Sequence, residues 1–102
     1  MADSIRTPLK FDGLNFSIWK VRMTVFLQSL GSWVPKAVTK PYSEPTGDDD
    51  TWFDIAAKEY KANSKAQNVL FLALNVDDTT KVIHCKFAYE IWQHLLVTHE
   101  GT

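Results

Sequence analysis

Apolar residues recur at steps of three and four along most of this chain, and no stretch alternates apolar and polar residues with a period of two. The clearest helical stripe consists of Phe16, Trp19, Met23, Phe26, Leu27 and Leu30. Asn15 before it is a favourable N-cap residue, and Gly31 after it lies where a helix end favours a residue able to adopt a positive φ. The sequence therefore predicts a first helix over residues 15–30.

A second helical stripe follows a run of three aspartates. The helix is expected to start at Asp50 or Thr51, either of which can cap it, and to extend to Leu74. Its predicted inner positions are Trp52, Ala56, Tyr60, Asn63, Ala66 or Gln67, Leu70 and Leu74. Residues 69–74 are apolar all round, which indicates burial on more than one side and makes this the central helix. Asn63 on its inner side is either at the edge of the core or hydrogen-bonded within it.

The remaining segments are less regular. Residues 31–50 lack periodicity and are punctuated by proline and glycine, so we expect a long exposed loop, with one short helical turn near Trp33. A break over 75–78 precedes a short helix over 79–85, in which Val82 and Ile83 face inward. A last helix is expected over 87–98, with Gly101 as the residue that terminates it. Its predicted inner residues are Ala88, Ile91, Trp92, Leu95 and Leu96.

These elements predict an all-α fold, a compact bundle of four to five helices. A single helical domain is expected over residues 15–102. An extended arm is expected over residues 1–14, and Phe11 of this arm is expected to pack onto the first helix. The chain of 102 residues has the size of one domain, and its apolar content of 45% is sufficient for a core.

Charge and cysteine content exclude several classes of protein. Eleven Lys and Arg oppose twelve Asp and Glu, so the strong basic field of a nucleic-acid binder is absent. One cysteine cannot form an intramolecular disulfide, which fits a reducing, cytoplasmic compartment. The N-terminus does not resemble a secretory signal, and no apolar stretch approaches the roughly 20 residues of a membrane span. Lys20 and Arg22, exposed on the first helix, are either solubilising charges or part of a weak contact with RNA or a membrane surface.

Three histidines and one cysteine raise the question of a metal or catalytic site. His84 and Cys85 are adjacent, so on a helix they point about 100° apart and chelate one metal poorly. Glu90 and His94 share a helix face, but a second ligand pair is missing and His99 is out of register with His94. No nucleotide-binding or nucleophile motif occurs. We therefore expect no metal, no cofactor and no enzymatic activity.

Four tryptophans are the unusual component of this chain. Trp19, Trp52 and Trp92 fall on the inner stripes of three helices, where they either pack in the core or line a peptide pocket. Trp33 lies in the connector instead, where it either caps the bundle or belongs to a contact surface. Together with Tyr42, it is a candidate for a protein contact surface, because interfaces are enriched in aromatic side chains.

Three stretches resemble the Gag polyprotein of copia-type long-terminal-repeat retrotransposons, especially those of plants. The first reads Phe11-x-Gly13-x-Asn15-Phe16-x-x-Trp19-Lys20-x-Arg22-Met23. The second is the helix from Trp52 to Leu74, with Asn63-x-Lys65-Ala66-x-Asn68. The third reads Cys85-x-x-Ala88-x-Glu90-Ile91-Trp92-x-x-Leu95-x-x-Thr98-His99-Glu100-Gly101-Thr102. The motif core expected from this resemblance is Phe11, Gly13, Asn15, Trp19, Trp52, Leu70, Leu74, Ala88, Ile91, Trp92 and Leu95.

The resemblance implies a function that composition does not reveal. Such Gag proteins multimerise into a virus-like particle that encloses the RNA and replication enzymes of the element. Their helical core is similar to the capsid part of retroviral Gag, and residues 15–102 would correspond to its N-terminal part. Family members continue with more helices and often a zinc knuckle, before which this chain ends. The resemblance therefore implies a structural, self-associating capsid domain.

An adaptor function is the alternative to self-association. A monomeric derivative of such a domain, retained by a host gene, would hold a partner peptide in a groove between helices. Trp33, Tyr42 and Asn63 would line this groove. The expected partners are therefore copies of this chain, or one protein or peptide, with RNA bound only weakly or indirectly and no membrane.

Overall fold

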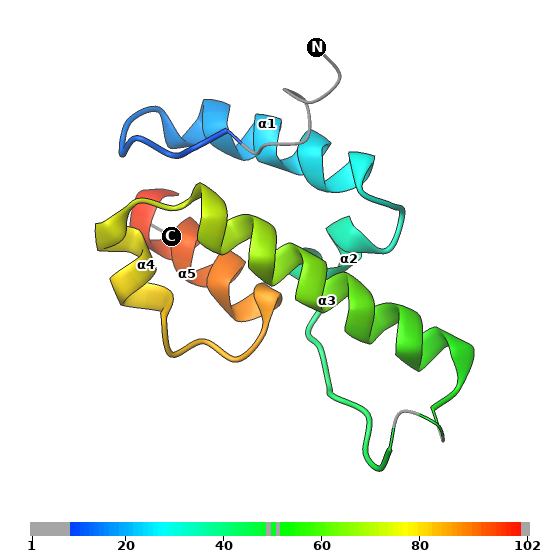
Figure 1. Ribbon diagram of the computed structural model, residues 1–102. Coiled ribbons are helices and arrows are strands. Elements are labelled where there is room, and N and C mark those ends of the chain that lie inside the picture. The colour runs from blue at the N-terminus through cyan, green and yellow to red at the C-terminus, as the bar shows by residue number, and fades with distance from the viewer. Residues whose placement is uncertain (1–8, 49, 51, 101–102) are drawn as a thin grey trace.

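The computed structural model describes residues 9–48, 50 and 52–100, and most of them belong to five α-helices (Figure 1). The helices are α1 (Phe16–Ser29), α2 (Val34–Thr39), α3 (Asp54–Ala73), α4 (Val76–Val82) and α5 (Ala88–Glu100). α3 is the longest helix, α2 and α5 pack against it, α4 packs against α5, and α1 forms an outer layer. The described residues contain no strand, which confirms the predicted all-α bundle.

The core confirms the predicted inner faces of the first and last helices. α1 buries Phe16, Trp19, Met23 and Leu27, while α5 buries Ala88, Ile91, Trp92 and Leu95. Three further predicted inner residues are partly buried against this core, namely Phe26, Leu30 and Leu96. α5 extends two residues beyond the predicted end at residue 98, and its predicted terminator, Gly101, lies outside the described residues.

The described part of the predicted arm, residues 9–14, is attached to the bundle at two points. The backbone amide of Phe11 donates to the carbonyl of Ala73 at the end of α3 (2.7 Å). The indole Nε1 of Trp19 donates to the carbonyl of Leu9 (2.8 Å). The Phe11 side chain is only 1% exposed, and its ring centroid lies 5.3 Å from that of Trp19. Phe11 therefore packs onto α1 as predicted, and it also connects α1 to α3.

A tight turn leads from this arm into α1. Asp12 Oδ1 accepts a hydrogen bond from the backbone amide of Leu14 (2.8 Å), and Gly13 has a φ of 92°. Asn15 flanks α1 as predicted, but its side chain makes no capping hydrogen bond, so the predicted side-chain cap is wrong. The reason is its backbone: Asn15 has a φ of 52°, in the left-handed region, whereas a capping side chain requires extended backbone. Glycine and asparagine are the residues that tolerate these conformations best.

The connector contains α2, which confirms the predicted short helical turn near Trp33 and extends it to Thr39. Pro35 lies in the first turn of this six-residue helix, where its missing N–H costs nothing. Val34, Ala37 and Val38 are buried between neighbouring helices, so the predicted exposed loop is wrong over these residues. Residues 40–48 contain no helix, in agreement with the prediction. A helix of six residues is too short to show a periodicity and depends on tertiary packing.

The first turns of α3 also differ from the prediction. The helix begins at Asp54, so Trp52 precedes it and is not a core residue. The indole Nε1 of Trp52 donates to the carbonyl of Thr46 (3.2 Å), and its ring centroid lies 5.0 Å from that of Tyr60. Tyr60 is 40% exposed, and Ala56 is only half-buried. These predicted inner positions are wrong because the N-terminal end of α3 projects beyond the other helices (Figure 1).

The second half of α3 is the centre of the bundle, with buried side chains at Ala62, Asn63, Ala66, Val69, Leu70, Ala73 and Leu74. Leu72 is 59% exposed, so the predicted burial all round is wrong there. Asn63 is 4% exposed and hydrogen-bonded within the core, the second of the two predicted alternatives. Its Oδ1 accepts from the backbone amide of Ala88, the first residue of α5 (2.9 Å), and its Nδ2 donates to Gln67 Oε1 (3.0 Å). Gln67 Nε2 donates in turn to the carbonyl of Lys86 (2.7 Å).

α4 begins three residues earlier than predicted, inside the expected break. Asn75 caps it, since its Oδ1 accepts from the backbone amide of Asp78 (2.8 Å). The predicted break is wrong because asparagine and aspartate, which favour loops in general, also favour the cap position and the first turn of a helix. Val82 is fully buried as predicted, whereas Ile83 is 59% exposed, so its predicted inward direction is wrong.

Candidate interaction surfaces

The residues with reactive side chains do not converge. His84 is exposed, and Cys85 is half-buried beside it. Burial raises the pKa of the Cys85 thiol, and the nearby Glu90 carboxylate adds to the effect. Glu90 Oε1 accepts from the backbone amide of Lys86 (2.8 Å) at the start of α5, rather than pairing with His94. Within residues 9–48, 50 and 52–100, no three His, Cys, Asp or Glu side chains are placed to hold a metal ion.

One polar pair in the interior was missed from the sequence. His99 Nε2 lies 2.9 Å from Asp78 Oδ1, and the Asp78 side chain is only 4% exposed. The imidazole of His99 also stacks on Phe16, with ring centroids 5.0 Å apart, and meets the Phe11 ring edge-on at 4.8 Å. This pair joins α4 to α5 beneath the N-terminal arm, so its role is structural. Asp78 and His99 are 21 residues apart in the sequence, so no helical periodicity relates one to the other.

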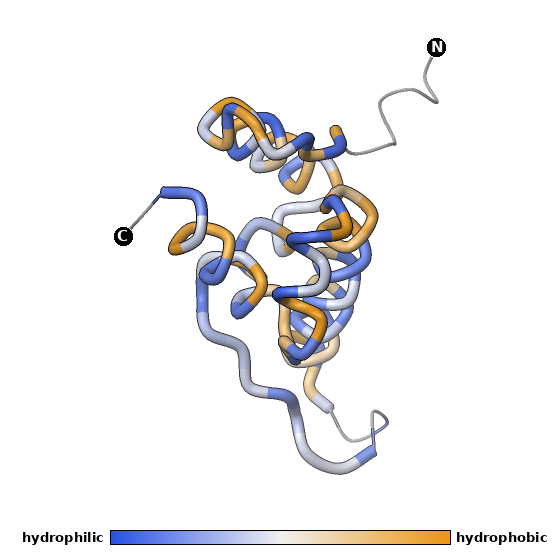
Figure 2. Tube along the Cα trace, turned by 90° about the vertical axis from the view of Figure 1, so that its left-hand side faces the viewer, coloured by the Kyte–Doolittle hydropathy of each residue, from blue (hydrophilic) through white to orange (hydrophobic). Residues whose placement is uncertain are grey.

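The outer face of α1 is apolar, a feature that the sequence analysis does not predict. Leu14, Ile18, Val21 and Val25 are 68%, 55%, 64% and 58% exposed. Steps of three and four place Ile18, Val21 and Val25 on one side of the helix, opposite the stripe that faces the core, and Leu14 lies in the turn just before the helix. Figure 2 shows hydrophobic and hydrophilic positions interspersed along α1. An apolar face of this kind on a surface helix is a candidate interaction site.

A depression of about 240 Å³ adjoins this apolar face at its N-terminal end. It lies between the arm and α1, and Leu9, Leu14 and Ile18 belong to its lining. Asp12 and Arg22 also line it, so both signs of charge occur there. Arg22 is exposed as predicted, while Lys20 is half-exposed because its Nζ pairs with Glu100 Oε2 on α5 (2.8 Å).

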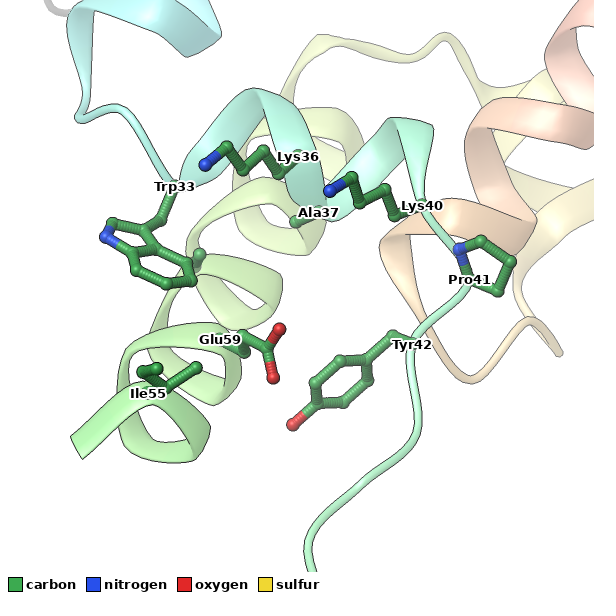
Figure 3. A pocket seen from close by; sticks show the side chains of 9 residues that line it. Trp33, Lys36, Ala37, Lys40, Pro41, Tyr42, Ile55 and Glu59 are labelled. Atoms are coloured by element: carbon green, nitrogen blue, oxygen red, sulfur yellow. The ribbon is translucent and has the colours of Figure 1, made fainter. Parts of the chain in front are cut away.

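A second cavity, of about 250 Å³, separates Trp33 from Tyr42 (Figure 3). The two predicted interface aromatics lie on opposite sides, Glu59 of α3 lies between them, and Lys36 and Lys40 follow the α2 edge. The Nζ of Lys36 lies 5.0 Å from the centroid of the Trp33 ring, a cation–π contact. Asn63, expected in this groove, does not line it.

The Tyr42 hydroxyl is buried at the edge of this cavity. It has no hydrogen-bond partner in the part of the chain that the structure describes. Burial raises the pKa of Tyr42, and the neighbouring carboxylates of Glu44 and Glu59 raise it further. The tyrosine ring is held in place by Phe87, which it meets edge-on with centroids 5.0 Å apart. The cavity thus offers a hydroxyl donor and the Glu59 carboxylate acceptor, both without a partner inside the described chain.

The motif residues of the resemblance occupy two kinds of position. Eight of them are buried, namely Phe11, Trp19, Leu70, Leu74, Ala88, Ile91, Trp92 and Leu95. Gly13 and Asn15 supply the left-handed backbone of the turn before α1. Trp52 belongs to neither group, because it is half-buried outside the helices. Most of the pattern therefore has a structural explanation in packing and backbone conformation.

Comparison with known proteins adds no relative. No family model, no curated protein and no solved structure matches this chain. Among the described residues, no helix is long and apolar enough to cross a lipid bilayer.

Proposed function

We propose that this chain is a non-catalytic structural domain that self-associates through α1, as the capsid-like part of a copia-type Gag polyprotein would. Its association would contribute to a particle around the RNA of the element. The observation that carries this proposal is the exposed apolar face of α1, formed by Ile18, Val21 and Val25 together with Leu14 just before the helix. The resemblance of the three sequence stretches described above supports the same function.

Two features of this face favour a second copy of the chain as the occupant. Ser17 and Ser29 flank the apolar residues, so another helix can approach closely. The depression near Ile18 lies at one end of the face, and the exposed side chain of Val25 lies at the other. An antiparallel pair of α1 helices places Val25 of each copy at the depression of the other. Such a two-fold arrangement is the commonest symmetry of self-association.

The size of the face sets the strength of the contact. The four side chains expose roughly 400 Å² of apolar surface, comparable with the largest patches on ordinary monomers. A pair would then bury roughly 800 Å² through these side chains, less than the about 1,200 Å² of a stable interface. We therefore expect weak association, with a dissociation constant of roughly 0.1–1 mM. Contacts of this strength suit a shell, in which each contact is repeated many times.

The experiment is sedimentation equilibrium from about 10 µM to 1 mM protein, a range that brackets the expected dissociation constant. We expect the mean mass to rise with concentration from the 11.7 kDa monomer. Higher salt should weaken association only slightly, because apolar contacts dominate the face. The variant Val25→Asp should remove the concentration dependence, because pairing would bury an unpaired carboxylate.

Val97→Asp is the matched control. Val97 is also a valine, also 58% exposed and also near the C-terminal end of its helix, but it lies on α5. This variant should associate like the wild type. A monomer at all concentrations, or equal loss of association in both variants, would contradict the role of α1.

The adaptor is kept as a second candidate function because a different observation favours it. The cavity between Trp33 and Tyr42 is an apolar cleft with a few polar groups, the arrangement typical of peptide grooves. In this case the wild type stays monomeric and one discrete partner protein occupies the cleft. The two functions use different faces, so variants in α1 and in the cleft separate them.

A further inference from the structure

Two adjoining depressions share the residues Trp33 and Ala62. The first is the 250 Å³ cavity between Trp33 and Tyr42, and the second, of about 130 Å³, lies on the other side of Trp33. We call the two together the Trp33 groove. It runs between α2 and the N-terminal half of α3, the part of α3 that projects beyond the bundle (Figures 1 and 3).

The Trp33 groove concentrates positive charge. Its lining includes five of the eleven basic residues of a chain whose net charge is −1: Lys36 and Lys40 in the first depression, with Lys58, Lys61 and Lys65 in the second. Glu59 is the only carboxylate in either lining. None of the five lysines forms an ion pair with a carboxylate of the described residues. The lining thus carries five lysines against one carboxylate, and Glu44 beside Tyr42 adds a second carboxylate nearby, so the groove has an excess of positive charge on a protein that is nearly neutral overall.

The spacing of these lysines lowers the stability of the protein when no ligand is bound. On α3, Lys61 and Lys65 are four apart, and Lys58 precedes Lys61 by three. Lys40 lies just past the end of α2, so it is outside this helix pattern. Like charges at these spacings are neighbours on a helix surface and repel one another. A bound negative partner would remove this repulsion, so the field of the groove is complementary to an acidic ligand.

The polar groups of the first depression favour a peptide over RNA as the ligand of the groove. Glu59 accepts hydrogen bonds and the Tyr42 hydroxyl donates one, which matches the N–H and C=O groups of a peptide backbone. A phosphate backbone offers acceptors and would be repelled by Glu59. Base stacking is also disfavoured, because Lys36 lies over the Trp33 ring and Phe87 meets the Tyr42 ring edge-on. A cavity of about 250 Å³ instead has room for one large apolar side chain.

We propose that the Trp33 groove binds an acidic peptide segment of a partner protein, with one large apolar or aromatic side chain inserted between Trp33 and Tyr42. The carboxylates of the peptide lie along the lysines of α2 and α3. This interaction is separate from the self-association proposed for α1, and it rests on the adaptor function, whose peptide it specifies as acidic. It uses a separate surface, so either proposal can fail without the other.

A fluorescein-labelled nonapeptide with one central phenylalanine and four glutamates on each side tests the proposal by fluorescence anisotropy. Replacing its phenylalanine by alanine should weaken binding about tenfold or more, because the cavity loses its apolar occupant. Replacing its glutamates by lysines should abolish binding. Amide shifts in the NMR spectrum of the protein should locate the peptide at Trp33 and Tyr42, and not on α1.

Charge reversal on the protein supplies the matched comparison. The double variant Lys40→Glu/Lys61→Glu changes one exposed lysine on each side of the groove and should weaken peptide binding about tenfold or more. Lys10→Glu/Lys81→Glu changes the net charge equally at exposed positions outside the groove, so it should bind like the wild type. The α1 variant Val25→Asp should also bind the peptide normally.

Three results would overturn the proposal. The first is no saturable binding of the acidic phenylalanine peptide at millimolar protein. The second is equal weakening by the two charge-reversed double variants, which would indicate a general charge effect. The third is tighter binding of a uridine decamer than of the peptide, which would identify the groove as a nucleic-acid site.

Discussion

Replacing Asn63 by alanine tests whether a side chain of α3 supplies the N-terminal cap of α5. Asn63 Oδ1 accepts from the backbone amide of Ala88 (2.9 Å), and both residues are buried, at 4% and 0% exposure. The amide of Ala88 belongs to the first turn of α5, where no carbonyl of the same helix is available to it. In the variant Asn63→Ala this amide is buried without a partner.

The magnitude follows from the environment of these atoms. A buried donor left without an acceptor costs about 1–3 kcal/mol. Alanine recovers roughly 0.5 kcal/mol through its higher helix propensity in α3. We therefore expect Asn63→Ala to lower the free energy of unfolding by about 1.5 kcal/mol. For a domain of this size, this corresponds to a fall in Tm of roughly 6–12 °C.

Urea and thermal unfolding followed by circular dichroism measure this loss. Asn68→Ala is the matched control, because Asn68 lies on the same helix but is exposed, so this variant should stay within about 0.5 kcal/mol of the wild type. Hydrogen exchange at the Ala88 amide reports the cap directly and should accelerate in Asn63→Ala only. Equal stability of the two variants would refute the tertiary cap.

Three further predictions concern the arm, the buried pair and the thiol. Phe11→Ala should cost about 3–5 kcal/mol in urea unfolding because a fully buried ring is lost, whereas Leu9→Ala, at 45% exposure, should cost less than about 1 kcal/mol. Asp78→Ala should destabilise by about 2–4 kcal/mol, because His99 loses its buried partner and α4 loses an acidic residue in its first turn; a loss below about 1 kcal/mol would contradict this. Burial raises the pKa of the Cys85 thiol, so the folded protein should react with a disulfide reagent more slowly than the urea-unfolded chain at pH 8. The folded state holds this proton more tightly, so stability should fall as pH rises above the thiol pKa of the unfolded chain. The variant Cys85→Ala should lose less stability in that range, and identical pH profiles would exclude the thiol as a contributor.

The long helices were predictable from the sequence because their apolar residues repeat with the period of a helix. The predicted range 15–30 compares with Phe16–Ser29 in α1, and the inner residues of α5 were correctly identified. The same information fails for Tyr60, which continues the apolar stripe of α3 but is 40% exposed. A stripe indicates which side of a helix can be buried, and only the neighbouring helices decide where along the helix burial begins.

The candidate surfaces were predictable only in part. Trp33 and Tyr42 were identified as interface residues from their position in the connector, but their convergence on one cavity with Glu59 depends on α2, which is too short for a periodic signal. The outer face of α1 is harder to predict, because its apolar residues are fewer than those of the core stripe on the opposite side. Ile18, Val21 and Val25 nevertheless follow one another at helical steps in the sequence.

The sequence by itself determined the all-helical class, the two long periodic helices with their core stripes, and the residues that form the last helix. These are local properties, since each depends on residues within a few turns of one another. Only the tertiary structure decided that Asn63 caps α5, that Asp78 meets His99 and that lysines of α2 and α3 border one groove. Such pairings depend on the distances and angles at which helices pack, and these are set jointly by side chains that are far apart along the chain.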